Sequence, residues 1–246
     1  MIEVAAFVVG IVLGSFANVL IHRLPRRESV VSPGSHCAQC GVPILPWDNL
    51  PVISYLLLRG RCRRCGAQIS PRYLVVEVVV GLLFAGVAGR FGLSVEAGRF
   101  AAFALALVVV FFTDLEMGLI PNAVTYPGIG IGLVFAALSG TFVSAFVSAA
   151  GVGALFLLIA ILSRGGMGGG DIKLATMIGA FLGAPGVIVA MFLAVALGAL
   201  AGGVLMALRL RTRKHTIPFG PALAVGAMIA VFGSDAIVRW YLTRML

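Results

Sequence analysis

Stretches of apolar residues, many of them close to the length of a membrane-spanning helix, follow one another along almost the whole chain. Hydrophobic residues make up 61% of the sequence and charged residues only 11%, which is about half the charged fraction of a typical soluble domain. A helix needs roughly 20 mostly apolar residues to cross a bilayer. The sequence therefore predicts an all-α integral membrane protein and argues against an unusually apolar soluble core.

We predict about eight transmembrane helices. Their expected ranges are 2–22, 74–90, 98–113, 122–138, 142–163, 172–183, 186–208 and 219–242. The span at 172–183 is short and interrupted by glycine, so we expect it to be tilted or partly fused with its neighbour. The first span lacks a basic start and a small-residue cleavage site, which favours a retained helix over a cleaved signal peptide.

The basic residues predict how the helices are oriented. Fourteen of the eighteen Lys and Arg residues fall in the segments 23–73, 164–173 and 209–217, on one side of the predicted layout. Because basic residues accumulate on the cytoplasmic side of membrane proteins, we expect these segments in the cytoplasm and both termini outside it. The net charge of +9 then suits an anionic membrane surface, and no nucleic-acid partner is expected.

One polar segment, residues 23–73, separates the first two predicted spans and holds all four cysteines. They form two CxxC pairs, namely Cys37 with Cys40 and Cys62 with Cys65. Two such pairs resemble a zinc ribbon, in which four thiolates surround one tetrahedral Zn²⁺. Disulfides, which a reducing cytoplasm disfavours, and free or redox-active thiols stay open as alternatives. A closed four-thiolate site would fold this small insert without performing chemistry.

Two aspartates lie at the predicted cytoplasmic ends of membrane helices. Asp114, in FFTDLEMGLIPNAVTYPG, is expected to end one helix, and Asp171, in GGMGGGDIKL, to begin another after a run of glycines. Two neighbouring carboxylates share a proton, so one can activate water while the other protonates the carbonyl or the leaving amine. The spacing alone also allows alternatives to a catalytic pair. Asp171 could be a helix cap and Asp114 a loop residue, or both could form a relay in a transporter.

Several motifs spread over the chain are similar to those of a single family. GGGD at 168–171 matches a GxGD motif, and residues 114–121 match the pattern D-x5-[IL]-P. The segments GSFANVLIHRLP (14–25), WDNLPVISYLLLRGRCRRC (47–65) and IPFGPALAVGA (217–227) match further family signatures. Together with the four-cysteine insert, these motifs resemble the type IV prepilin peptidases, a family of bifunctional leader peptidases and N-methyltransferases.

The resemblance implies a function and a set of site residues. It implies cleavage of type IV prepilins and pseudopilins after a glycine, and methylation of the new N-terminus from S-adenosylmethionine. The enzyme would be a multi-pass protein of the inner (cytoplasmic) membrane, serving type IV pili or type II secretion. Asp114 and Asp171 would be the catalytic pair, and Glu116 would take no part. The weaker candidates for binding substrate or cofactor are Gly60, Trp47, Asn49, Glu77, Gly168, Gly170 and Lys173.

The resemblance also implies three parts: a first helix at 1–22, a methyltransferase-associated insert at 23–73, and a helical bundle at 74–246 that carries the peptidase site. The chain departs from the family pattern RYPxxE, because Leu74 follows Tyr73 where many members have proline. That change affects how the helix begins more than its chemistry. A peptidase without methylation, an ion-coupled transporter and a non-catalytic zinc-ribbon scaffold stay open as alternatives, as does the oligomeric state.

Overall fold

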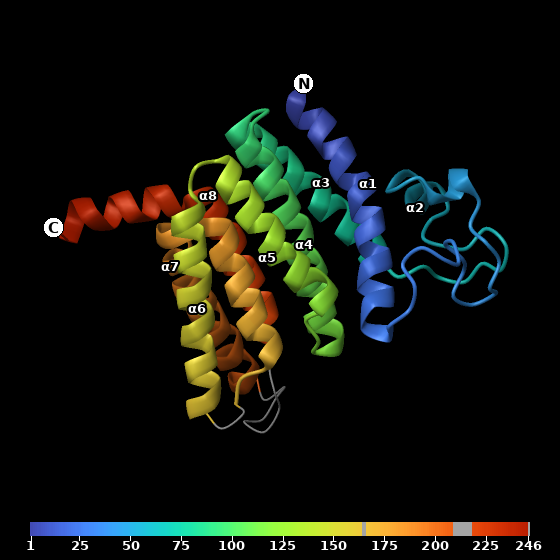
Figure 1. Cartoon of the computed structure of the whole chain (residues 1–246). Helices are drawn as coiled ribbons and strands as arrows, with labels where there is room; N and C mark the ends of the chain where they lie inside the picture. Colours follow the sequence, from blue (N-terminus) through green and yellow to red (C-terminus); the bar gives the residue numbers. More distant parts are fainter. Residues whose placement is uncertain (164–165, 209–217, 246) are drawn as a thin grey trace. The chain divides into compact units, whose positions relative to one another are not determined.

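The computed structural model describes residues 1–163, 166–208 and 218–245, and its regular structure is helical. Arg164 and the basic segment 209–217, both of which entered the predicted orientation, lie outside these residues. The chain divides into two compact units, Met1–Ala97 and Gly98–Leu246 (Figure 1).

The first unit is built on a pair of long helices. α1 (Ile2–Arg23) packs against α3 (Arg72–Phe91). A Cβ atom on Gly14 of α1 would lie 2.8 Å from the Cα atom of Glu77 in α3. Small residues permit such close contact between membrane helices, where van der Waals packing replaces the hydrophobic effect as the driving force.

The insert lies between these two helices in the sequence and contains only short elements. They are η1 (Leu24–Arg26), η2 (Pro46–Asn49) and α2 (Ile53–Leu57). Two isolated antiparallel bridges pair His36 with Pro43 and Arg61 with Gln68. Each bridge closes a small hairpin around one CxxC pair.

The second unit contains the remaining helices of the described residues, with α4 entering it at Gly98. They are α4 (Val95–Met117), α5 (Asn122–Leu138), α6 (Phe142–Leu162), α7 (Gly169–Ala207) and α8 (Gly220–Met245). α7 packs against α5, α6 and α8. In the core, the ring of Phe103 stacks on that of Phe181, with 4.5 Å between their centroids.

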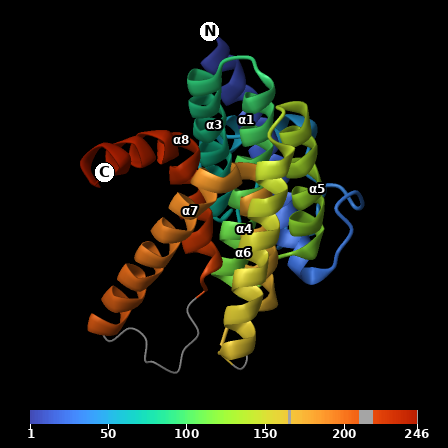
Figure 2. The same cartoon turned by 60° about the vertical axis from the view of Figure 1, so that its left-hand side comes forward.

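α7 is sharply bent at Gly183, whose φ of 70° and ψ of −172° are not helical. Pro185 follows two residues later, and the Ser144 hydroxyl of α6 accepts a hydrogen bond of 3.2 Å from the Ala184 N–H. The second arm of α7 returns toward the end of the unit where the first arm began (Figure 2). The predicted spans 172–183 and 186–208 correspond to these two arms.

The predicted fold class, a helical membrane protein, is confirmed, but the count of eight spans is not. Within the described residues, six helices are long and apolar enough to cross a membrane, and α5 is a shorter apolar helix. The prediction that Asp114 ends its helix was wrong by about one turn. α4 continues to Met117, and the next residue, Gly118, adopts a φ of 62° and donates its N–H to the Asp114 carbonyl at 2.9 Å. Glycine takes this left-handed conformation easily and so terminates the helix there.

Candidate active site and metal centre

Asp114 lies in the last turn of α4 with only 6% of its surface exposed. Its Oδ2 atom accepts a hydrogen bond of 2.9 Å from the backbone N–H of Gly220, the first residue of α8. The first N–H groups of a helix have no acceptor within the helix and carry partial positive charge. The start of α8 therefore holds the Asp114 carboxyl group in place through a donor that has no acceptor within its own helix.

This contact requires glycine at position 220. A Cβ atom there would lie 2.6 Å from Oδ2 of Asp114 and 3.0 Å from its Cγ. Pro221 comes next, where the first turn tolerates a residue without an N–H. Gly220 lies within the motif at 217–227, but nothing in the sequence alone indicates that residue 220 contacts residue 114, so its role is visible only in the structure.

Asp171 lies in the first turn of α7, where Gly168 rather than Asp171 takes the N-cap position. A Cβ atom on Gly168 would lie 3.2 Å from Oδ2 of Asp171, and one on Gly170 would lie 3.0 Å from Cβ of Ile120. The two glycines thus leave room for Asp171 and for the connection between α4 and α5. Among the described residues, the Oδ1 atom of Asp171 is buried and has no hydrogen-bond partner. A buried polar atom in this state calls for an explanation, such as a shared proton, water or a ligand.

The two aspartates lie at the same end of the second unit. The C-terminal end of α4 and the N-terminal ends of α5, α7 and α8 meet there (Figure 1). The Asp114 and Asp171 carboxyl groups are close enough to interact electrostatically. Residues separated by more than fifty positions are therefore brought together, as a two-carboxylate site requires.

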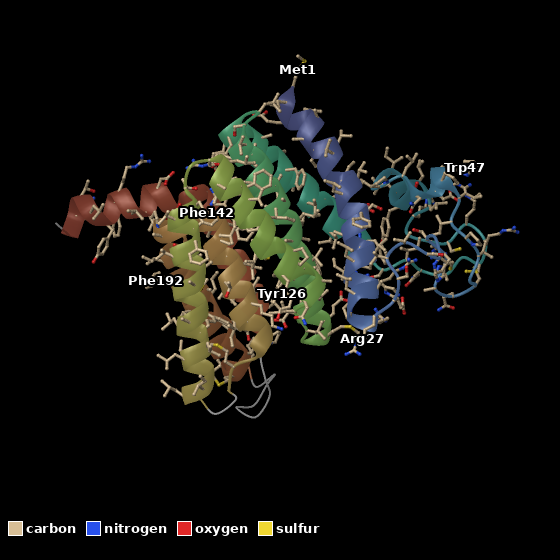
Figure 3. The ribbon with its side chains drawn as sticks, in the orientation of Figure 1. Met1, Arg27, Trp47, Tyr126, Phe142 and Phe192 are labelled. Carbon is tan, nitrogen blue, oxygen red and sulfur yellow. The ribbon has the colours of Figure 1, made fainter. Side chains whose placement is uncertain are left out.

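Lys173 joins α7 to α5 beside this site. Its Nζ atom donates a hydrogen bond of 2.7 Å to Oδ1 of Asn122 and lies 5.4 Å from the centroid of the Tyr126 ring. Figure 3 labels Tyr126 near the same end of α5. Lys173 is thus held in place two residues after Asp171. Neither Asn122 nor Tyr126 could be predicted as a partner of Lys173, because no sequence motif links them to it.

The four cysteines form a cluster suited to a metal ion. Their Sγ atoms all lie within 4.8 Å of one another, and those of Cys37 and Cys65 are 3.9 Å apart. Four thiolates bound tetrahedrally to Zn²⁺ at 2.3 Å would be separated by about 3.8 Å. Gly41 and Gly66 turn the chain after each pair with φ angles of 70° and 71°. The donor set therefore fits one tetrahedral metal, and the sequence prediction of a metal-binding cluster is supported.

The cluster also favours the ionised form of one ligand. Backbone hydrogen bonds from Cys40 and Gln39 lower the pKa of the Cys37 thiol to about 6. The thiolate is the form that binds metal. All four cysteines are free rather than joined in disulfides, so the disulfide alternative finds no support.

The candidates for methyl transfer surround α2. Glu77 is buried in α3, and its Oε2 atom accepts a hydrogen bond of 2.7 Å from the Val52 N–H. Gly60 has a φ of 65°, and a Cβ atom on it would lie 2.9 Å from the Tyr55 hydroxyl. The Trp47 carbonyl accepts a hydrogen bond of 2.8 Å from the Ser54 hydroxyl. Asn49 is the exposed last residue of η2.

The apolar helices and the four-cysteine cluster define a multi-pass membrane protein with a metal-binding insert. Residues 8–91 match the bacterial peptidase A24 N-terminal domain, and residues 101–203 match the type IV leader peptidase family. The chain belongs to the type IV leader peptidase family.

Several similar proteins carry the name prepilin leader peptidase/N-methyltransferase. The protein from Bacillus subtilis (strain 168) is 34% identical over 98% of both chains. The protein from Aeromonas hydrophila is 37% identical over 98% of this chain and 93% of its own. The protein from Neisseria gonorrhoeae is 35% identical over 97% of this chain and 94% of its own. No solved structure matches the chain.

Proposed function

We propose that the protein cleaves the leader peptides of type IV prepilins and pseudopilins after a glycine and then methylates the new N-terminus. The observation that carries the peptidase half is the meeting of Asp114 and Asp171 at one end of the second unit. The relatives named above are prepilin leader peptidases and N-methyltransferases. We place the enzyme in the inner membrane, with the insert and both aspartates toward the cytoplasm.

The two carboxyl groups divide the chemistry of cleavage between them. Asp114, held by the Gly220 N–H, is the carboxylate that takes a proton from the attacking water. Asp171, whose buried Oδ1 has no partner among the described residues, carries the shared proton and delivers it to the carbonyl oxygen. The water oxygen bonds to the carbonyl carbon and the C–N bond breaks. The proton that Asp114 took from water passes to the leaving amine, and the proton on the former carbonyl oxygen returns to Asp171. Lys173 positions the start of α7 through Asn122.

The insert supplies the methyl-transfer half. Zn²⁺ is the metal that we assign to Cys37, Cys40, Cys62 and Cys65, where it stabilises the insert and takes no part in the reaction. When bound, S-adenosylmethionine would supply the methyl group to the new N-terminal amine, which would give up one proton as it is methylated. Residues around α2, namely Trp47, Asn49, Gly60 and Glu77, are the candidates for holding the donor and the amine.

Mass spectrometry of a prepilin tests this proposal. The purified enzyme in vesicles is incubated with a prepilin and S-adenosylmethionine, and the product masses are measured. We expect loss of the leader at its terminal glycine and one added methyl group on the new N-terminus. Cleavage without the methyl group would leave a peptidase only, and an uncut prepilin would overturn the proposed function.

Replacing Gly220 by alanine tests the contact that holds Asp114. The new Cβ atom would collide with the carboxylate at 2.6 Å, and misplacing a catalytic group by about 1 Å costs roughly 100-fold in rate. We expect Gly220→Ala to lower kcat for cleavage by about that factor, with little change in KM, because the substitution displaces a reacting group rather than a binding group.

Gly233→Ala is the matched control on the same helix. Its Cβ atom would meet only Ile237 Cδ1, at 3.6 Å, so kcat should remain near that of the wild type. If Gly220→Ala cleaves as fast as Gly233→Ala, the Gly220 N–H does not position Asp114.

A further inference from the structure

A stretch of the insert with exposed apolar side chains lies beside the membrane helices. We call residues 44–58 the apolar loop; it contains η2 and α2. Its large exposed side chains are Ile44, Leu45, Trp47, Leu50, Ile53, Leu56 and Leu57. Trp47 is 62% exposed and Leu57 is 78% exposed. A patch of this kind on an aqueous module would normally be covered by a partner or by lipid.

The depth of the loop along the helices identifies its surroundings. The Val52 N–H donates to Glu77, which lies five residues, or about 8 Å, beyond the first residue of α3. Glu77 packs against Gly14, nine residues or about 13 Å before the last residue of α1. One leaflet of the hydrocarbon core is about 15 Å thick. When the charged ends of α1 and α3 are taken as the membrane boundary, Val52, in the middle of the loop, is therefore level with the part of these helices that lies inside a leaflet.

The view of the side chains agrees with this depth. Arg27 lies at the charged end of α1, whereas Trp47 is level with a point nearer the middle of that helix (Figure 3). Both residues belong to the first unit.

The backbone and the charges of the loop suit a lipid environment. Backbone N–H groups in hydrocarbon must find acceptors within the protein. Those of Ser54, Leu56 and Leu58 donate to carbonyls within the loop, and that of Val52 donates to Glu77. The only charged side chain in the loop is Asp48, and Arg63 pairs with it at 2.6 Å. This ion pair lowers the pKa of Asp48 through hydrogen bonds from Arg63.

We propose that the apolar loop is seated among the acyl chains of the leaflet on the side of the insert, so that the insert is anchored in the bilayer by its own side chains. The metal cluster then lies toward the headgroups, together with the arginines that follow the loop, namely Arg59, Arg61, Arg63 and Arg64. Cationic side chains meet anionic lipid there. In this arrangement the exposed Trp47 side chain contacts lipid rather than the methyl donor, which leaves Asn49, Gly60 and Glu77 as the methyl-transfer candidates. Neither enzymatic activity is needed for the loop to be seated in this way.

Tryptophan fluorescence tests the seating directly, because the chain has only two tryptophans, Trp47 and Trp240. Trp240→Phe leaves Trp47 as the only reporter in the full-length protein. The protein is reconstituted into phosphatidylcholine–phosphatidylglycerol vesicles whose acyl chains carry bromine at defined depths. We expect brominated lipid to quench Trp47 at least twofold and aqueous iodide to quench it weakly.

Two further reporters in a background without Trp47 and Trp240 sharpen the experiment. Leu57→Trp should be quenched by brominated lipid, because the Leu57 side chain is more exposed than that of Trp47 in the same loop. Val31→Trp is the matched control, since Val31 is 86% exposed on the insert outside the apolar loop, and iodide rather than lipid should quench it. Iodide quenching at both Trp47 and Leu57→Trp would overturn the proposal. So would protection from both quenchers, which would indicate that a protein covers the loop.

Discussion

Asparagine in place of either Asp114 or Asp171 is expected to lower the rate of leader cleavage by roughly 10²- to 10⁴-fold, the range that general acid–base catalysis contributes. The Asp114 side chain can still accept the Gly220 N–H through its amide oxygen, so the fold should survive. Residues that act as one unit are strongly non-additive. The double variant should therefore be no slower than the slower single variant. Cleavage of a prepilin by each purified variant is measured by mass spectrometry.

Glu116→Gln is the control, since Glu116 lies two residues after Asp114 on an exposed part of α4. It should cleave at nearly the wild-type rate. Cleavage that persists in both asparagine variants would refute the two-aspartate mechanism, and loss of cleavage in Glu116→Gln would mean that the wrong carboxylate of α4 has been assigned.

Removing the metal is expected to separate the two activities. Cys62→Ser leaves three thiolates in the cluster, and structural zinc sites contribute about 10–16 kcal/mol of apparent binding free energy that is also folding free energy. We expect the variant to lose its bound metal, the insert to become sensitive to limited proteolysis, and methylation to fall below detection. Cleavage should remain within a few-fold of the wild type, because both aspartates lie outside the insert.

His36→Ala is the control for ligand identity. His36 is adjacent to Cys37, and its ring contacts the Gly34 carbonyl at 3.0 Å, so the four-thiolate cluster should keep one metal per chain. Elemental analysis of both variants gives the metal content. If Cys62→Ser or a chelator abolished cleavage as completely as loss of an aspartate, the two activities would not be separable in this way.

The membrane class and the metal cluster could be predicted from the sequence because both depend on local sequence patterns. The length of an apolar stretch identifies a membrane-spanning helix. Two CxxC pairs, each followed by a glycine, identify a metal-binding cluster whatever the surrounding fold. The bend in α7 was anticipated in part, since the short span 172–183, interrupted by glycine, was expected to be tilted or partly fused with its neighbour.

The contacts around the aspartates could not be predicted in the same way. Whether Gly220 meets Asp114 depends on how α4 and α8 pack, and the hydrophobic pattern of a helix in lipid says little about which face meets which neighbour. The same holds for Asn122 with Lys173. The boundary of α4 was missed because the polar residues Thr113, Asp114 and Glu116 end the apolar run, although the helix itself continues until glycine terminates it.

Because α7 bends at Gly183, the direction of its first arm determines where Asp171 lies. Asp171 lies twelve residues from Gly183, or about 18 Å along the helix. A change of about five degrees in the direction of this arm would move the Asp171 carboxyl group by about 1.5 Å. A side chain at residue 183 would be strained at a φ of 70° and would approach the Ser144 hydroxyl at 3.1 Å. The distance between the Asp114 and Asp171 carboxyl groups therefore depends on the backbone angles at Gly183, at the far end of the first arm from Asp171.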